Sequence, residues 1–150
     1  LYGNFIAGWY RFFRCGVSTI LLEPVSGHGC WDGKQPFGSL APGAVPVAPV
    51  AVLTRATIRA GKIKRFWEHM DEVSHQLHRV PGLISSLSIG EIPFLKQATF
   101  SIWNSSEDMH AFAYGTVRHI NVVQKTREEK WYTEELFVRF KVLVEYRSVL

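Results

Sequence analysis

The chain has 150 residues, the length of one ordinary domain, and 47% of them are hydrophobic, which is enough for a packed core. Its net charge of +4 is modest and its basic and acidic residues are mixed, so nucleic acid is not an expected partner. No apolar run reaches the roughly 18 to 20 residues of a membrane-spanning helix. Cys15 and Cys30 lack metal-ligand spacing and no signal peptide is visible, so we expect a cytoplasmic protein.

The first 37 residues are interpreted as the remnant of a preceding α+β half-domain. Residues 2–14 are apolar and aromatic at helical spacing, residues 18–23 resemble a short strand, and residues 28–33 form a Gly-rich loop. This part is too small for a core of its own, and the chain looks clipped at its beginning. Its aromatic side chains either are the buried face of a helix or place the protein on a membrane surface: Phe5, Trp9, Tyr10, Phe12 and Phe13.

Residues 38–49 (GSLAPGAVPVAP) are so rich in Gly, Pro and Ala that they predict a linker. Beyond it, residues 50–58 alternate as a strand. Residues 63–78 carry an apolar stripe that predicts an amphipathic helix, which ends before Pro81.

Residues 83–90 and 97–103 predict the two strands of a hairpin. Ser105 and Asp108 resemble a helix cap, and the apolar face of that helix continues to Val123. Residues 137–146 alternate again and predict the last strand.

The order βαββαβ over residues 50–146 predicts an α+β, ferredoxin-like sandwich, in which one antiparallel four-stranded sheet carries both helices on one face. The other face is also apolar and has no cover of its own. We expect a second subunit or a preceding half-domain to cover it, as in a dimeric α+β barrel whose interior is a pocket.

Five stretches after the linker resemble the second half of spheroidene monooxygenase-like proteins. A sixth stretch, ILLEPVSGHGCWDGKQPFG at residues 20–38, resembles the segment that closes the first half of that family. The five stretches are AVLTRATIR (51–59), PGLISSLSIGEIP (81–93), QATFSIW (97–103), MHAFAYG (109–115) and TREEKWYTEELFVRFKVL (126–143).

The resemblance implies an oxygenase of carotenoid biosynthesis that hydroxylates an acyclic carotenoid end and oxidises it to a ketone. It also implies a haem cofactor, an electron donor protein and an apolar substrate that favours a membrane surface. The chains of the family are longer, because they carry a first α+β half that is mostly missing here. This chain is therefore expected to be a fragment.

Haem is also what remains when other cofactors are eliminated. Oxygen chemistry needs a metal or an organic redox group, and the sequence lacks flavin, nicotinamide and 2-His-1-carboxylate patterns. His119 is the favoured haem ligand, because it borders the apolar stripe of its helix and follows the AFAYG block as in the family. The alternative is a helix-border histidine satisfied by a carbonyl or carboxylate. His28 is the second candidate ligand, ahead of His69, His75, His78 and His110.

Arg55 lies on an otherwise apolar strand face and therefore needs an anionic partner. Two partners remain open: a haem propionate, or the carboxylate of Glu134 or Glu135. Four aromatic residues are candidates for binding the polyene, although such residues more often form a core: Trp103, Trp131, Tyr132 and Phe140.

Two other functions remain open. The same barrel can bind an apolar ligand or pair subunits without catalysis, since a fold alone does not choose a function. A haem-degrading or small-aromatic monooxygenase would explain the topology, but it would not explain the long matching stretches.

Overall fold

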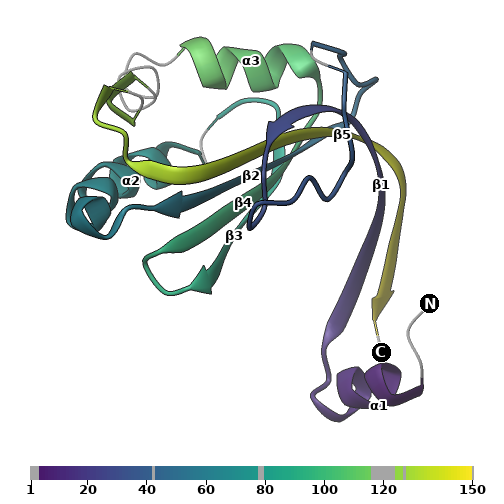
Figure 1. The fold of residues 1–150 in the computed structure, drawn as a ribbon. Coiled ribbons are helices and arrows are strands. Elements are labelled where there is room, and N and C mark those ends of the chain that lie inside the picture. Colours follow the sequence, from purple (N-terminus) through teal and green to yellow (C-terminus); the bar gives the residue numbers. More distant parts are fainter. Residues whose placement is uncertain (1–3, 42, 78–79, 116–123, 127, 150) are drawn as a thin grey trace.

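The computed structural model describes residues 4–41, 43–77, 80–115, 124–126 and 128–149. One antiparallel sheet organises them, with the strand order β1-β5-β2-β4-β3 (Figure 1). The predicted four-stranded ferredoxin-like sheet is present as β5-β2-β4-β3, and β1 extends it by a fifth strand. The strands are β1 (Gly16–Gly29), β2 (Val50–Ile58), β3 (Leu83–Ile92), β4 (Lys96–Trp103) and β5 (Tyr132–Val149).

Two helices, α2 (Ile63–Leu77) and α3 (Ser106–Gly115), lie on one face of the sheet, as predicted (Figure 1). Phe66 of α2 packs against Ile58 and Trp131, and Met109 of α3 packs against Val50. Both contacts use the same face of β2, because side chains along a strand alternate between faces.

The start of α3 confirms the predicted cap. The backbone N–H of Asp108 donates to Oγ of Ser105 at 3.1 Å, and this hydroxyl donates to the Asp108 carboxylate at 3.0 Å. The predicted continuation of this helix toward Val123 lies outside the described residues. A short 3-10 turn, η1 (Ala60–Lys62), leads from β2 into α2.

The second face of the sheet is partly covered, which corrects the expectation that it has no cover. The segment after β1 crosses it and packs Trp31, Phe37 and Leu40 on a buried cluster around Val138 and Phe140. The β3 end of this face stays open, and Leu87 is 59% exposed there. The cover is incomplete because the segment reaches β5, β2 and β4 but leaves the outer strand β3 uncovered.

β1 and β5 are longer than the alternation predicts, because the two strands extend each other. β5 pairs with β2 only from Tyr132 to Lys141, and from Val142 to Val149 it pairs only with β1 within the described chain. This two-stranded ribbon leaves the body and carries the helix α1 (Asn4–Phe12) at its end (Figure 1). The strand predicted within residues 1–37 therefore belongs to the same sheet as the rest, and His28 lies in that strand, which corrects its assignment to a loop.

Phe5, Trp9 and Phe12 of α1 are exposed, Phe12 at 81%, whereas Tyr10 is half-buried. The sequence admits two interpretations of these aromatic residues, either as the buried face of a helix or as a contact with a membrane surface. The described residues place no cover over this helix, so they do not bury its aromatic face. None of the helices in the described residues is long and apolar enough to cross a membrane.

Candidate functional site

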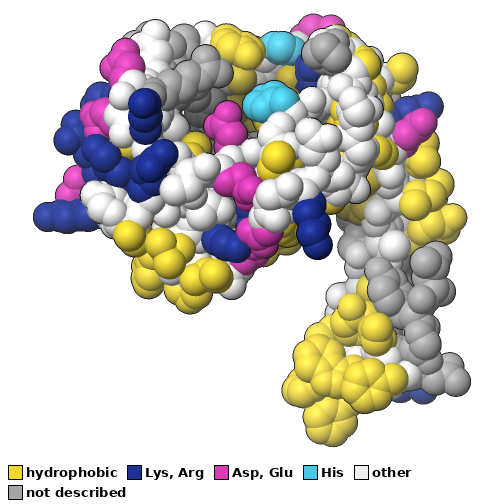
Figure 2. Space-filling model, viewed as in Figure 1, with side chains coloured by type: hydrophobic (Ala, Val, Ile, Leu, Met, Phe, Trp, Pro, Cys, Tyr) yellow, Lys and Arg dark blue, Asp and Glu magenta, His cyan; other side chains and the backbone are white. Residues whose placement is uncertain are grey.

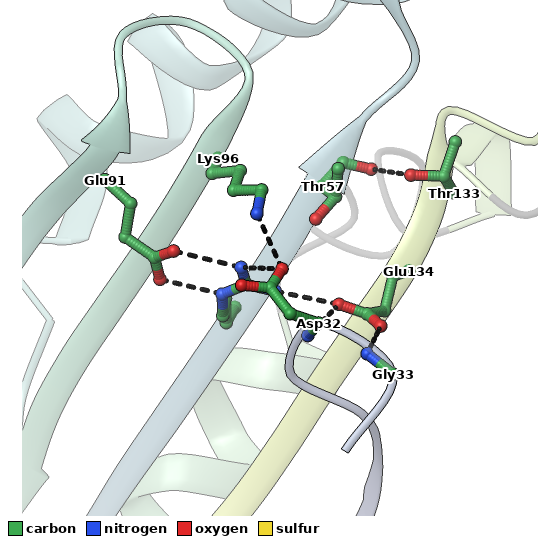
Figure 3. Close-up of polar contacts among 8 residues, drawn as sticks. Asp32, Gly33, Thr57, Glu91, Lys96, Thr133 and Glu134 are labelled. Atoms are coloured by element: carbon green, nitrogen blue, oxygen red, sulfur yellow. Dashed lines mark hydrogen bonds and ion pairs between the residues drawn. The ribbon is translucent and has the colours of Figure 1, made fainter.

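The most tightly bonded polar group on the second face is the guanidinium of Arg55 on β2, which is 0% exposed. Each of its three nitrogens meets a carboxylate (Figure 3). Nε donates to Glu91 at 2.7 Å, Nη1 to Glu134 at 2.9 Å, and Nη2 to both Asp32 and Glu91 at 3.0 Å. A buried cation is tolerated when it is paired and fully hydrogen-bonded in this way.

The same cluster fastens the turn that follows β1. Glu134 accepts the backbone N–H groups of Asp32 and Gly33 at 2.8 and 2.7 Å. Lys96 at the start of β4 donates to Asp32 at 2.6 Å, and the ring of Trp31 lies 4.9 Å from the guanidinium carbon of Arg55. The turn is therefore held from β2, β4 and β5 at once.

Hydrogen bonds within the cluster lower the pKa of two of its carboxylates, Asp32 and Glu134. The hydrogen bond from Lys96, followed by the bond from Arg55, lowers the pKa of Asp32. The backbone N–H of Gly33 is the main cause that lowers the pKa of Glu134. The hydrogen bonds to Glu91 raise the pKa of Arg55 above its ordinary value.

A pocket of about 230 Å³ lies beside this turn, between the end of β1 and the segment that crosses the sheet. Phe37, Leu40 and Val138 are among its lining residues, and so is His28 at the end of β1. The full lining is Gly27, His28, Gly29, Gln35, Pro36, Phe37, Gly38, Ser39, Leu40, Leu136 and Val138.

The histidines are placed as follows. His119, the favoured haem ligand, lies outside the described residues, as does His78, and the side chain of His75 is not described. His28 stacks on Phe137 with ring centroids 5.6 Å apart. The remaining two are engaged elsewhere: His69 contacts the carbonyl of Arg65 and Nζ of Lys125, and His110 stacks on Tyr114.

The four aromatic candidates for the polyene site fall into three separate clusters. Trp103 packs with Val50 under α3, whereas Trp131 and Tyr132 pack with Phe66 under α2. Phe140 lies on the opposite face of the sheet. None of the four lines the pocket described above, so their role in binding a substrate stays a prediction. Burial of Tyr132 raises the pKa of its hydroxyl to about 12.

The predicted carboxylate partner of Arg55 is Glu134, whereas Glu135 is not among the partners. Sequence reasoning missed Asp32, Glu91 and Lys96. Each is an ordinary polar residue at the end of a strand or in a turn. The available signal was an acidic residue in a turn, which could have been considered as a partner for the arginine on an apolar strand. All three nitrogens of Arg55 already have carboxylate partners. A haem propionate as a further partner of Arg55 stays a prediction.

Comparison with known sequences finds proteins named spheroidene monooxygenase, although no family model matches the chain. The protein of Cereibacter sphaeroides is 42% identical over 126 residues, which is 83% of this chain and 39% of the relative. The protein of Rhodobacter capsulatus is 38% identical over 141 residues, or 90% and 57%. The protein of Rubrivivax gelatinosus is 42% identical over 132 residues, or 87% and 49%.

Solved structures share the fold at low sequence identity. Rv0793 from Mycobacterium tuberculosis is 16% identical, with a TM-score of 0.57 over 65% of this chain and 97% of that chain. FN1347 from Fusobacterium nucleatum is 11% identical, with a TM-score of 0.59 over 87% of this chain and 53% of that chain. The chain thus spans about half the length of its curated relatives, and over that part its sequence matches the spheroidene monooxygenases.

Proposed function

We propose that this chain is part of a monooxygenase that oxidises an acyclic carotenoid end group with O₂. The observation that carries the proposal is the 38–42% identity to proteins named spheroidene monooxygenase over 83–90% of the chain. The structures that share its fold support the architecture alone.

The reaction defines what else must take part. A C–H bond of the end group becomes C–OH, one atom of O₂ enters the product, and the other leaves as water after taking up two protons and two electrons. A second round at the same carbon and loss of water yield the ketone. The electrons must come from a donor, which we propose is a separate protein.

We also propose haem as the cofactor, with His119 as the residue that would hold its iron. Haem supplies the O₂ chemistry that protein side chains lack. Among the described residues, His28 is the histidine beside a pocket, but about 230 Å³ is below the roughly 300–1,000 Å³ of typical ligand clefts. The residues around His28 therefore do not fit a haem, and the proposal depends on His119.

Absorbance spectroscopy tests the cofactor. The chain reconstituted with haem should show a Soret band that His119→Ala removes, whereas the control variants His28→Ala and His110→Ala should keep it. A band that His119→Ala leaves unchanged in position and stoichiometry rejects this ligand.

The activity is tested by incubating the chain with spheroidene, O₂ and a reductant, and by looking for a product that has gained oxygen. Product formed by the chain and absent with His119→Ala supports the proposal. Tight binding of spheroidene without any product supports the alternative, a non-catalytic module for apolar ligands.

We propose that the protein works at the periphery of a membrane, where an apolar substrate dissolves. We also propose that a second α+β sheet, from another subunit or another half-domain, covers the open part of the second face. The exposed Leu87 and the incomplete cover by the segment after β1 support this pairing.

A further inference from the structure

The turn between β3 and β4 presents apolar side chains outward. Ile92 is 44% exposed and Phe94 is 61% exposed, with Pro93 exposed between them. Figure 2 shows a hydrophobic group at the lower left of the molecule, where Figure 1 places the end of this hairpin. We call Ile92, Pro93 and Phe94 the hairpin tip.

The conformation of the hairpin tip does not favour Phe94. The N–H of Leu95 donates to the carbonyl of Ile92 at 3.1 Å, which closes a four-residue turn with Pro93 in second place. Phe94 is in third place with a φ of 65°, in the left-handed region that glycine or asparagine occupies at much lower cost. An exposed aromatic residue in this place costs local stability, which the single edge contact of its ring with Trp67 offsets only in part.

The hairpin tip is fixed to the body of the protein. The ring of Trp67 on α2 lies 6.0 Å from the ring of Phe94 in an edge arrangement. The N–H of Ile58 donates to the carbonyl of Leu95 at 2.7 Å. The tip therefore protrudes as an apolar point attached to β2 and α2, beside the junction of these two elements.

Basic residues surround that junction. The side chain of Lys64 is 92% exposed and its contact with Glu68 is long, at 4.0 Å. Lys62 and Arg65 share Glu129, and the Nε of Arg59 donates to a backbone carbonyl. Four basic side chains against the two acidic ones, Glu68 and Glu129, leave a formal charge of +2, and Figure 2 shows the Lys and Arg side chains above the hydrophobic group.

We propose that the hairpin tip and these four basic residues dock on a membrane surface that contains anionic lipids. Aromatic and aliphatic side chains enter the headgroup boundary, while Lys and Arg stay with the lipid phosphates. The charge complementarity favours lipid phosphates, and the protruding apolar point favours a bilayer over a flat protein surface. The proposal extends the proposed function, since a bilayer is where a carotenoid dissolves, and it would orient the Arg55 end of the sheet toward the lipid.

The helix α1 is the competing contact, because it too has exposed aromatic residues and an arginine. Two of its rings contact Phe13, the residue after the helix, with centroid distances of 4.5 Å for Trp9 and 4.9 Å for Phe12. This helix supplies matched controls at the far end of the molecule (Figure 1).

The test measures binding of the chain to vesicles of phosphatidylglycerol and phosphatidylcholine by flotation, without any carotenoid. Lys64→Gln should weaken binding about fivefold, from roughly 1 kcal/mol per basic residue. Phe94→Asn should weaken it tenfold or more, and it should leave the urea midpoint equal or higher, because asparagine tolerates the left-handed conformation. The controls Arg11→Gln and Phe12→Asn should bind like the parent chain.

Several results would overturn the proposal. One is a loss of binding in the α1 variants with none in the tip variants. Another is equal binding to vesicles of phosphatidylcholine alone, or no vesicle binding together with binding to an acidic protein. The vesicle test involves neither substrate nor turnover. A negative result in it therefore leaves the outcome of the activity test above unaffected.

Discussion

Arg55 Nε and Glu91 Oε1 lie 2.7 Å apart although their strands are not neighbours in the sheet. β4 runs between β2 and β3, and the residue of β4 that pairs with Arg55 is Ala98. Because alanine is small, the guanidinium passes over β4 and reaches the carboxylate on β3. The cluster thus joins β3 to β5 across the intervening strands, together with the turn after β1.

Replacing Arg55 with Met should lower the free energy of unfolding by about 3–5 kcal/mol, because it leaves Glu91 and Glu134 without their cation. Urea unfolding monitored by circular dichroism measures the change. The matched control is Arg59→Met, an exposed arginine just beyond the same strand, which should change stability by less than about 1 kcal/mol. Equal effects of the two substitutions would show that the cluster adds no stability.

Stability should fall on the acid side because the folded chain lowers the pKa of Asp32 and Glu134. Below the ordinary values of 3.8 and 4.5, the unfolded chain takes up protons that the folded chain still refuses. The free energy of unfolding therefore decreases as the pH drops through this window. The stabilising contribution of the two carboxylates is fully present above about pH 5.

Urea midpoints measured between about pH 5 and pH 3 should fall less steeply for Glu134→Gln than for the parent chain. Glu135→Gln, at the exposed neighbouring position, should keep the parent slope. If all three chains share one slope, the proton linkage lies elsewhere.

Gly29 should not tolerate a side chain. Its φ is 90°, and a Cβ there would lie 2.0 Å from the backbone carbonyl oxygen of Glu135, which cannot move without disturbing the pairing of β1 with β5. Gly29→Ala should therefore destabilise the chain by more than about 2 kcal/mol.

Gly33→Ala is the matched control, since its φ of 73° is similar but the space around it is open. It should show the backbone cost alone, about 1 kcal/mol. Thermal unfolding of both variants separates the two effects, and equal losses would contradict the close approach at Gly29.

The open part of the second face should make the 150-residue chain self-associate. Leu87 and Ile89 on β3 are both exposed on the face that carries Phe100. Sedimentation velocity at tens of micromolar should show dimers or larger species, and Leu87→Ser with Ile89→Ser should shift them toward monomer. Val47→Ser, at an exposed position before β2, is the control, and a stable monomer of the parent chain would refute the prediction.

The sequence by itself determined the order of elements from β2 to β5. The alternation in Val50–Ile58, the apolar stripe of α2 and the cap at Ser105 are local patterns, because each depends on residues within a few positions of one another. The burial of Arg55 on an apolar strand likewise required a carboxylate, and Glu134 was among the predicted partners.

Only the tertiary structure decided which other carboxylates reach Arg55 and how far β1 and β5 run together. Glu91 approaches it through the pairing register of β3 and β4, where a shift by one residue would turn its side chain to the other face. Asp32 approaches it through the turn after β1, which Glu134 and Lys96 hold in place. The length of the β1 and β5 ribbon is set by each strand providing the other's hydrogen-bond partners. That pairing is a non-local property, so neither strand's own residues reveal where it ends.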